Sequence, residues 1–180
     1  MADQRGMFTY ASSMDVLGSE TQRVVARSLY VPKHRYGFLL NQWDQLCNMV
    51  INQRKIKLTM NIQDGYVVLV TSPDNRSMSD LWKCFYFIRA VILGFKIIEA
   101  SAILYSDDVG VKSIDMSNVS IKHKGHKWTL SCERNMKLYG RSRKTSIVME
   151  GNLIHILGLK WSIQNAITSL PPLGLGCCVN

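Results

Sequence analysis

The sequence predicts an α+β fold of two similar modules, each a three-stranded sheet covered by helices. Three observations lead to this prediction. Two stretches, 55–70 and 145–157, have the alternating or β-branched pattern of paired strands. Their turns carry a glycine, Gly65 in one and Gly151 in the other, and an apolar helical pattern follows each pair. Because these glycines are 86 residues apart, we interpret the chain as one small unit used twice.

In the first module we expect, in chain order, a strand at 27–31, a helix at 36–52, strands at 55–62 and 66–70, and a long buried helix from 81 to 94. The helix at 36–52 is expected to be continuous, since apolar residues recur at helical spacing and Gln42 is the one polar residue among them. The next strand keeps its apolar face up to Ile62. Gly94 is the stop signal of the long helix.

In the second module the expected elements are a helix at 97–105, a strand at 111–119, a basic stretch at 121–144 with one helix near 128–136, strands at 147–149 and 153–157, and a helix up to 170. After Gly158 the apolar residues change to helical spacing, so Leu159 is expected to be the first apolar residue of the helix. The modules are expected to span 25–98 and 99–172, between a flexible tail at 1–24 and a C-terminal tail at 173–180.

Length and composition place the chain among folded proteins. With 180 residues, 47% of them hydrophobic, it can bury a sizeable core. No apolar run reaches the roughly 18 residues of a membrane span, and the polar start of the chain lacks the apolar core of a signal peptide. The five cysteines form no C-x-x-C pair, which argues against a disulfide framework. We therefore expect a soluble, intracellular protein.

The positive charge is concentrated in the C-terminal part of the chain. Residues 1–115 hold 13 Lys and Arg against 11 Asp and Glu, whereas residues 116–180 hold 9 against 2. The net charges of the two parts are therefore +2 and +7. Because Lys and Arg bind nucleic acids mainly by neutralising phosphates, this distribution favours RNA or DNA over an anionic membrane. A basic surface that is merely solvated is the alternative.

The strongest candidates for RNA contacts lie in the basic stretch of the second module, where Glu133 is the single acid. Its cations can contact phosphates, and Trp128 or Tyr139 can stack on a base, although each aromatic side chain could equally be a core residue. The predicted RNA-binding residues are Lys122, Lys124, Lys127, Arg134, Lys137, Arg141, Arg143 and Lys144. A weaker basic patch follows the first strand and consists of Lys33, His34 and Arg35.

Metal binding and catalysis have little support in the sequence. A zinc site without a C-x-x-C pair would require three scattered residues to converge, namely His123, His126 and Cys132. The adjacent acids Asp107 and Asp108 stand at a predicted helix end, where carboxylates are usually solvated rather than bound to a metal. His155 faces away from its apolar strand neighbours, which favours a hydrogen-bonded structural histidine over a catalytic one. With no phosphate-binding or dinucleotide-binding glycine motif either, we expect no enzyme, no cofactor and no metal.

The predicted order of strand, helix, short loop, hairpin and closing helix is the skeleton of a type I KH domain. The chain resembles a narrower group within this class, the Pno/Dim family of double-KH assembly factors of the small ribosomal subunit. Three blocks in the right order carry the resemblance: VPKHRY at 31–36, FIRAVILGF at 87–95 and IHILG at 154–158. The resemblance extends over roughly residues 25–172.

The resemblance implies a function and a set of partners. Proteins of this family bind precursor rRNA near the 3′ end of the small-subunit rRNA, in nucleolar pre-ribosomes and later in cytoplasmic ones. They contact the Nob endonuclease that makes the final cut, and they are not enzymes. By resemblance, the first module would mainly contact protein and the second would mainly contact RNA. A membrane and a small-molecule substrate are not expected.

The sequence departs from the family at the RNA clamp. The family carries a Gly-Lys-Gly-Gly loop in the second module, but the corresponding stretch here, 126–144, is shorter and Gly140 is its only glycine. The first module likewise has only Gly37 in its helical stretch. A GXXG loop depends on glycine because its backbone approaches phosphates and adopts positive φ. A KH-fold scaffold that has lost RNA binding and only bridges assembly factors is therefore the alternative.

Overall fold

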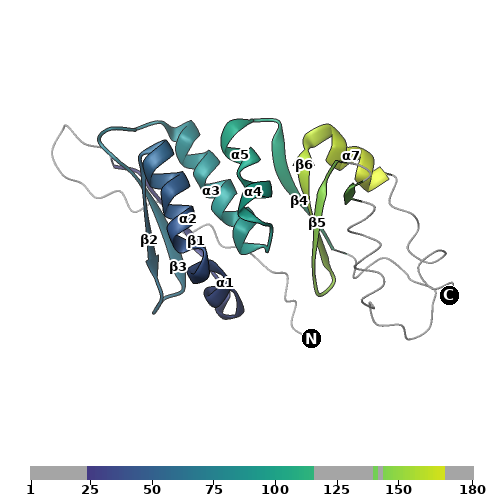
Figure 1. Ribbon diagram of the computed structural model, residues 1–180, viewed down its shortest axis with the longest axis horizontal. Helices are drawn as coiled ribbons and strands as arrows, with labels where there is room; N and C mark the ends of the chain where they lie inside the picture. Colours follow the sequence, from purple (N-terminus) through teal and green to yellow (C-terminus); the bar gives the residue numbers. More distant parts are fainter. Residues whose placement is uncertain (1–23, 116–139, 142–143, 169–180) are drawn as a thin grey trace, which may run out of the picture. The chain divides into compact units, whose positions relative to one another are not determined.

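The computed structural model describes residues 24–115, 140–141 and 144–168 (Figure 1). The chain divides into two compact units, and the first ends at Phe85 and the second begins at Tyr86. This boundary falls within a long helix, Met78–Ile92. Each unit contains a three-stranded antiparallel sheet. Within the described ranges, no helix has the length and the apolar run needed to cross a membrane.

The sheet of the first unit has the strand order β1-β3-β2. Its elements are β1 (Ala26–Tyr30), η1 (Lys33–Arg35), α1 (Tyr36–Asn41), α2 (Trp43–Cys47), η2 (Asn48–Asn52), β2 (Ile56–Asn61) and β3 (Tyr66–Thr71), followed by α3 (Met78–Ile92). The central strand β3 pairs antiparallel with both neighbours, so that Tyr30, Tyr66 and Asn61 stand side by side next to the hairpin turn.

The sheet of the second unit has the order β4-β6-β5. Its elements are α4 (Ile97–Ala100), α5 (Ala102–Tyr105), β4 (Val109–Asp115), β5 (Ser146–Glu150), β6 (Leu153–Leu159) and α7 (Lys160–Thr168). In both sheets the third strand of the unit lies between the first and the second. The predicted α+β fold with a duplicated three-stranded sheet is therefore confirmed.

Alternating side chains build the core of each unit. In the first unit the central strand buries Val67 and Leu69 completely. Arg27 of β1 lies on the same face of the sheet as its pairing partner Leu69. Its guanidinium lies 5.3 Å from the ring centroid of Trp82, so the start of α3 lies over this face. In the second unit, isoleucines of the sheet and of α7 pack together, namely Ile147, Ile154, Ile156 and Ile163. Burial of one such side chain contributes about 2 kcal/mol, so the cluster fixes the face that α7 covers.

The helix predicted at 36–52 is not continuous. Gln42 has φ −113° and ψ 9° and separates α1 from α2, and its N–H donates to the Leu39 carbonyl at 3.2 Å. The helical segment after α2 widens into the π-helical η2 before it ends. Apolar spacing cannot detect such a break, because the residues on both sides still face the core.

Several strand boundaries also differ from the prediction by one or two residues. The strand β2 ends at Asn61, whose side-chain oxygen accepts the N–H groups of Gln63 and Asp64 at 3.1 and 3.2 Å. This short-range bond turns the chain, so Ile62 lies in the loop and is 53% exposed. Leu159 belongs to β6, where it pairs with Val109, and α7 begins one residue later.

The long helix α3 is capped by a glycine, as predicted. Gly94 has φ 102° and its N–H donates to the Val91 carbonyl at 2.9 Å. The N–H of Phe95 donates to the Ala90 carbonyl at 3.2 Å. Together these bonds form a Schellman motif with glycine as the left-handed residue.

Candidate nucleic-acid interface

Two of the eight predicted RNA-binding residues lie in the described structure. Arg141 and Lys144 are both exposed; Arg141 is helical, and Lys144 lies two residues before the start of β5. The other six lie outside the described residues, namely Lys122, Lys124, Lys127, Arg134, Lys137 and Arg143. The candidates for stacking and for zinc binding also lie outside them, namely Trp128, Tyr139, His123, His126 and Cys132.

Backbone hydrogen bonds fix the chain at Lys144. Its N–H donates to the Arg141 carbonyl at 3.1 Å, and the N–H of Thr145 donates to the Gly140 carbonyl at 2.9 Å. This is the same Schellman pattern as at Gly94, but here the left-handed residue is a lysine with φ 56°. A left-handed residue that has a Cβ costs about 1–2 kcal/mol, so neighbouring groups must hold Lys144 in place.

Close packing around Thr145 provides this hold. Thr145 is buried, and its hydroxyl donates to the Gly140 carbonyl at 3.2 Å. A Cβ on Gly140 would lie 2.9 Å from the Thr145 carbonyl oxygen, and a Cβ on Gly158 would lie 2.9 Å from Thr145 Cγ2. The helix end, the start of β5 and β6 thus approach one another more closely than side chains would permit. Arg141 and Lys144 therefore stand on a backbone that is fixed on both sides.

The first unit has a matching lysine, which reasoning from the sequence missed. Lys55 also has φ 56°, and its N–H donates to the Ile51 carbonyl at 3.0 Å directly before β2. Lys55 and Lys144 are the two described residues other than glycine that have positive φ. Each ends the helical segment that precedes the second strand of its sheet. No sequence signal marks these positions, because glycine or asparagine usually occupies them.

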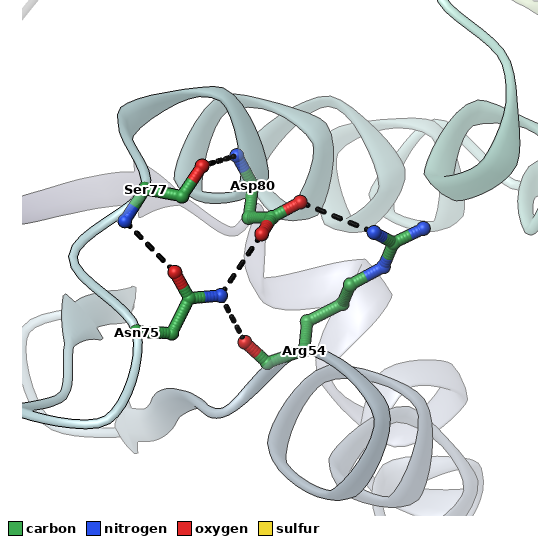
Figure 2. A network of polar contacts seen from close by, with 4 residues as sticks. All are labelled: Arg54, Asn75, Ser77 and Asp80. Carbon is green, nitrogen blue, oxygen red and sulfur yellow. Dashed lines mark hydrogen bonds and ion pairs between the residues drawn. The ribbon is translucent and has the colours of Figure 1, made fainter.

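Hydrogen bonds from polar side chains hold the backbone at Arg54 and Lys55, and Figure 2 shows the bond to the Arg54 carbonyl. The Ser72 hydroxyl donates to the Lys55 carbonyl at 2.6 Å. The Asn75 amide donates to the Arg54 carbonyl at 2.7 Å. The neighbouring carbonyl groups of Arg54 and Lys55, between η2 and β2, are thus bound by side chains of the loop after β3. This arrangement offsets the cost of the left-handed conformation of Lys55.

The same network anchors the start of α3 (Figure 2). Asp80 accepts a second bond from Asn75 at 2.9 Å and forms an ion pair with Arg54 at 3.1 Å. The N–H of Asp80 donates to the Ser77 hydroxyl at 3.2 Å, so Ser77 is the N-cap residue of α3. Burial raises the pKa of the Cys84 thiol to about 12, with a smaller lowering by Arg54 and a smaller raising by Asp80. Cys84 is therefore a neutral core residue below that pH.

The weaker basic patch forms η1, directly after β1. Lys33 and His34 are exposed, whereas Arg35 is half-buried. The N–H of Arg35 donates to the Pro32 carbonyl at 2.8 Å, which bends the chain away from the strand. The patch is accessible to a phosphate, but it carries far less charge than the basic run of the second module.

The remaining candidate residues have structural positions. His155 is 3% exposed, its Nδ1 lies 2.8 Å from the Ser113 hydroxyl, and its Nε2 lies 3.8 Å from the Glu150 carboxylate. This agrees with the interpretation of His155 as a hydrogen-bonded structural residue. Asp107 and Asp108 are exposed, and the Asp108 carbonyl accepts the first N–H of α7 at 2.8 Å. Among the described residues, no three His, Cys, Asp or Glu come together as metal ligands would.

The first unit has no glycine clamp. Its first two helices, α1 and α2, meet at Gln42, which is not in the left-handed region, and Gly37 lies inside α1. The exposed carboxylate of Asp44 follows two residues later. A GXXG grip on four nucleotides requires glycine backbone at such a loop, and a carboxylate there repels phosphate.

The topology defines the class of the protein. In each unit three antiparallel strands lie in the order first, third, second, and a helix follows the third strand. In the first unit the helices α1 and α2 connect the first strand to the second. This is the arrangement of a type I KH domain, so the chain is a tandem KH-fold protein.

Comparison with known proteins narrows this class, although no family model matches the chain. "RNA-binding protein pno1" of Dictyostelium discoideum is 29% identical over 183 residues, which cover 98% of this chain and 76% of that protein. "RNA-binding protein pno1" of Ixodes scapularis is 30% identical over 157 residues, 83% of this chain and 67% of that protein. "Pre-rRNA-processing protein pno1" of Emericella nidulans is 31% identical over 158 residues, 82% of this chain and 61% of that protein.

Solved structures share the fold. Dim2p from Pyrococcus horikoshii matches with a TM-score of 0.63 over 79% of this chain and 86% of that chain, at 19% identity. A chain of the a/eIF2alpha-aDim2p-rRNA complex from the same organism matches with a TM-score of 0.65 over 85% of this chain and 86% of that chain. With the 30% identity to the Ixodes scapularis relative, the chain belongs to the Pno/Dim family. It spans 76% of the Dictyostelium discoideum relative and 56% of a Caenorhabditis briggsae relative.

Proposed function

We propose that this protein is a non-enzymatic RNA-binding factor of ribosome biogenesis. It binds precursor rRNA near the 3′ end of the small-subunit rRNA and assists small-subunit assembly and final 3′-end processing. Membership of the Pno/Dim family, whose relatives are named as RNA-binding and pre-rRNA-processing proteins, supports this function. The observation that carries it is the charge of +7 on residues 116–180, two of whose cations, Arg141 and Lys144, stand exposed on a fixed backbone.

The two modules divide the work. The second module, residues 99–172, supplies the main RNA contacts through its eight basic residues, and the first module, residues 25–98, mainly contacts protein. Contacts to phosphates position an RNA but carry little sequence information. Sequence preference would then come from the shape of the rRNA and from neighbouring proteins.

The partners are a Nob-type endonuclease and other small-subunit assembly factors. The protein acts in the nucleolus and nucleus and accompanies late pre-ribosomes into the cytoplasm. Co-purification of the endonuclease with the full chain and co-sedimentation with small-subunit precursors test this part of the proposal. Sedimentation as a free protein under conditions that preserve the precursors would contradict it.

A salt titration of RNA binding tests the proposed function directly. The full chain is titrated with labelled single-stranded RNA by filter binding at 50 to 300 mM salt, a range chosen to span the steep region. Each phosphate contact to a single strand contributes about −0.7 to the slope of log affinity against log salt. Four contacts would therefore give a slope of about −3. No measurable binding at the lowest salt overturns the proposed function.

A charge-removal variant tests the site. Replacing Arg141, Arg143 and Lys144 by Ala should reduce the salt slope by about 2. It should also lower the affinity for RNAs of different sequence to a similar degree. A matched control removes three exposed cations elsewhere, Arg76, Lys96 and Lys112. An equal effect of the control, or a loss confined to one RNA sequence, argues against the assigned site.

A KH-fold scaffold without RNA binding is the second candidate, because the junction of α1 and α2 at Gln42 contains no glycine. It predicts co-purification of assembly factors by a chain that binds no RNA at any salt concentration. A nuclease would instead show metal-dependent cleavage of RNA that disappears in the Asp107→Asn and Asp108→Asn variants. Neither result is expected from the proposed function.

A further inference from the structure

The first sheet has one face that no described helix of its unit covers. Because the strands alternate, three rows of three residues share this outer face across β1, β3 and β2. The rows are Ala26, Val70 and Lys57; Ser28, Val68 and Thr59; and Tyr30, Tyr66 and Asn61. Seven of these nine residues are exposed, and the two valines are half-buried.

Two tyrosines form an aromatic pair at one end of the outer face. Tyr30 is 54% exposed and Tyr66 is 38% exposed, and their ring centroids lie 5.6 Å apart at an interplanar angle of 65°. Gly65 of the hairpin loop lies close to the Tyr30 ring, because an ideal Cβ on Gly65 would lie 3.5 Å from Tyr30 Cε2 and would collide with the Tyr36 hydroxyl. The pair is therefore a positioned aromatic surface that is open to solvent.

The outer face and the chain directly after Tyr30 carry cations that can contact phosphates. Lys57 is the only Lys, Arg, Asp or Glu among the nine residues of the outer face. Lys33 and His34 are exposed and follow Tyr30 by only three and four residues, which limits their Cα atoms to within about 11 to 14 Å of it. Asp64 in the hairpin turn places one negative charge next to the pair, and its carboxylate accepts a hydrogen bond from the Asn61 amide at 2.6 Å.

The matching row of the second sheet has different chemistry. Next to its hairpin turn stand Asp115, Leu153 and Glu150, where the first sheet has Tyr30, Tyr66 and Asn61. Two carboxylates in this row repel phosphates, and the row has no aromatic ring. The aromatic surface is thus a property of the first unit and not a general consequence of the repeated fold.

We propose that the outer face of the first sheet binds unpaired RNA, with bases stacked on Tyr30 and Tyr66 and phosphates close to Lys57 and Lys33. Aromatic rings on an open sheet recognise single-stranded RNA in RRM domains by stacking on its bases. The inference rests on the proposed function for its ligand, but it uses residues that the basic run does not include. It assigns RNA binding to the module otherwise expected to contact mainly protein.

Single and double Leu variants of the tyrosines in the full chain test the proposal. The probe is a labelled single-stranded RNA of about 12 nucleotides. Tyr30→Leu and Tyr66→Leu should each weaken binding about tenfold, with an unchanged salt slope because no phosphate contact is lost. Tyr30→Phe and Tyr66→Phe should keep wild-type affinity, since they keep the ring. The control is Tyr105→Leu, at a tyrosine that is 62% exposed outside the face.

A measurement on the wild-type chain keeps the test independent of how the variants fold. Photo-crosslinking with 4-thiouridine in the same RNA should give crosslinked peptides that contain Tyr30 or Tyr66. Wild-type affinity in the double Leu variant, or crosslinks confined to the second module, overturns the inference and leaves the outer face as a protein-docking surface. In that case a salt-dependent loss in the charge-removal variant would still support the proposed function, whereas a wild-type chain that binds no RNA would overturn both.

Discussion

Lys55 in the first unit and Lys144 in the second have the same φ of 56° at the same step of the KH topology, and different neighbours hold them there. Around Lys55, the side chains of Ser72 and Asn75 bind two backbone carbonyls. Around Lys144, two glycines let the chain pack against Thr145. Lys55 is thus held by hydrogen bonds from polar side chains, and Lys144 is held by close packing that the absence of side chains on two glycines permits. The first should tolerate extra volume but not the loss of a donor, and the second should do the reverse.

The largest expected effect comes from adding volume to the close packing that holds Lys144. Gly158 and Gly110 pair directly across β6 and β4, but a Cβ on Gly110 meets nothing within 4 Å, whereas one on Gly158 meets Thr145 Cγ2 at 2.9 Å. Gly158→Ala should lower the free energy of unfolding by about 2 kcal/mol, and Gly110→Ala by less than about 0.5. Chemical denaturation of the full chain measures both. Similar values for the two variants would show that packing at Thr145 does not hold Lys144.

The second effect comes from removing a hydrogen-bond donor next to Lys55. Asn75→Ala deletes the bonds to the Arg54 carbonyl and the Asp80 carboxylate and the bond accepted from the Ser77 N–H, and it should cost about 1.5 kcal/mol of unfolding free energy. Hydrogen exchange should accelerate at residues 50–58 and remain unchanged at 144–150. Gln45→Ala, at an exposed position in α2, is the control and should change neither. Acceleration in both segments would mean that the structures around Lys55 and Lys144 are not independent.

The third effect is a loss of stability at high pH in the first unit. The pKa of Cys84 is about 12 in the folded chain and 9.0 when unfolded, so the unfolded state releases the proton first as the pH rises. Cys84 therefore contributes stability that is fully present below pH 9 and falls by about 1.4 kcal/mol per pH unit between the two pKa values. Denaturation at pH 8 and pH 10, values chosen to bracket the unfolded pKa, should show this slope in the wild type. An equal slope in Cys84→Ala would assign it to other groups.

The smallest effect separates the folding role of the two lysines from RNA binding. Lys55→Gly and Lys144→Gly relieve the left-handed strain but make the unfolded chain more flexible, so each should stabilise the protein by about 0.5 kcal/mol. Lys144→Gly should also reduce the salt slope of RNA binding by about 0.7, whereas Lys55→Gly should not. Thermal denaturation and filter binding measure the pair. If Lys144→Gly stabilises the fold with unchanged RNA binding, the lysine is only a helix cap.

The sequence predicted the parts of the fold that depend on local patterns. The alternation of Ile56 and Leu58, the turn at Gly151 and the cap at Gly94 each appear in the structure, because one residue type or one period determines them. The break at Gln42 had a signal, a polar residue within an apolar run, but its consequence depends on the packing of α1 and α2. The end of β2 depended on the side chain of Asn61, which competes with the strand for backbone N–H groups.

The candidate site was less accessible from the sequence. Charge density alone identified Arg141 and Lys144, and the structure places both in solvent. The left-handed conformation of Lys55 could not be predicted, because it depends on Asn75, twenty residues further along the chain. The exposed pair of Tyr30 and Tyr66 required the register of β1 against β3, which no local pattern specifies.

The passage from β6 to α7 has a mechanical consequence. Leu159 is still paired with Val109 when Lys160 begins the helix, so no loop residue separates α7 from the sheet. A force on α7 is therefore passed directly to the central strand, and an outward rotation of the helix would break the 2.8 Å bond from the Lys160 N–H to the Asp108 carbonyl. If a bound partner pulls on α7, we expect the whole second sheet to respond as one body.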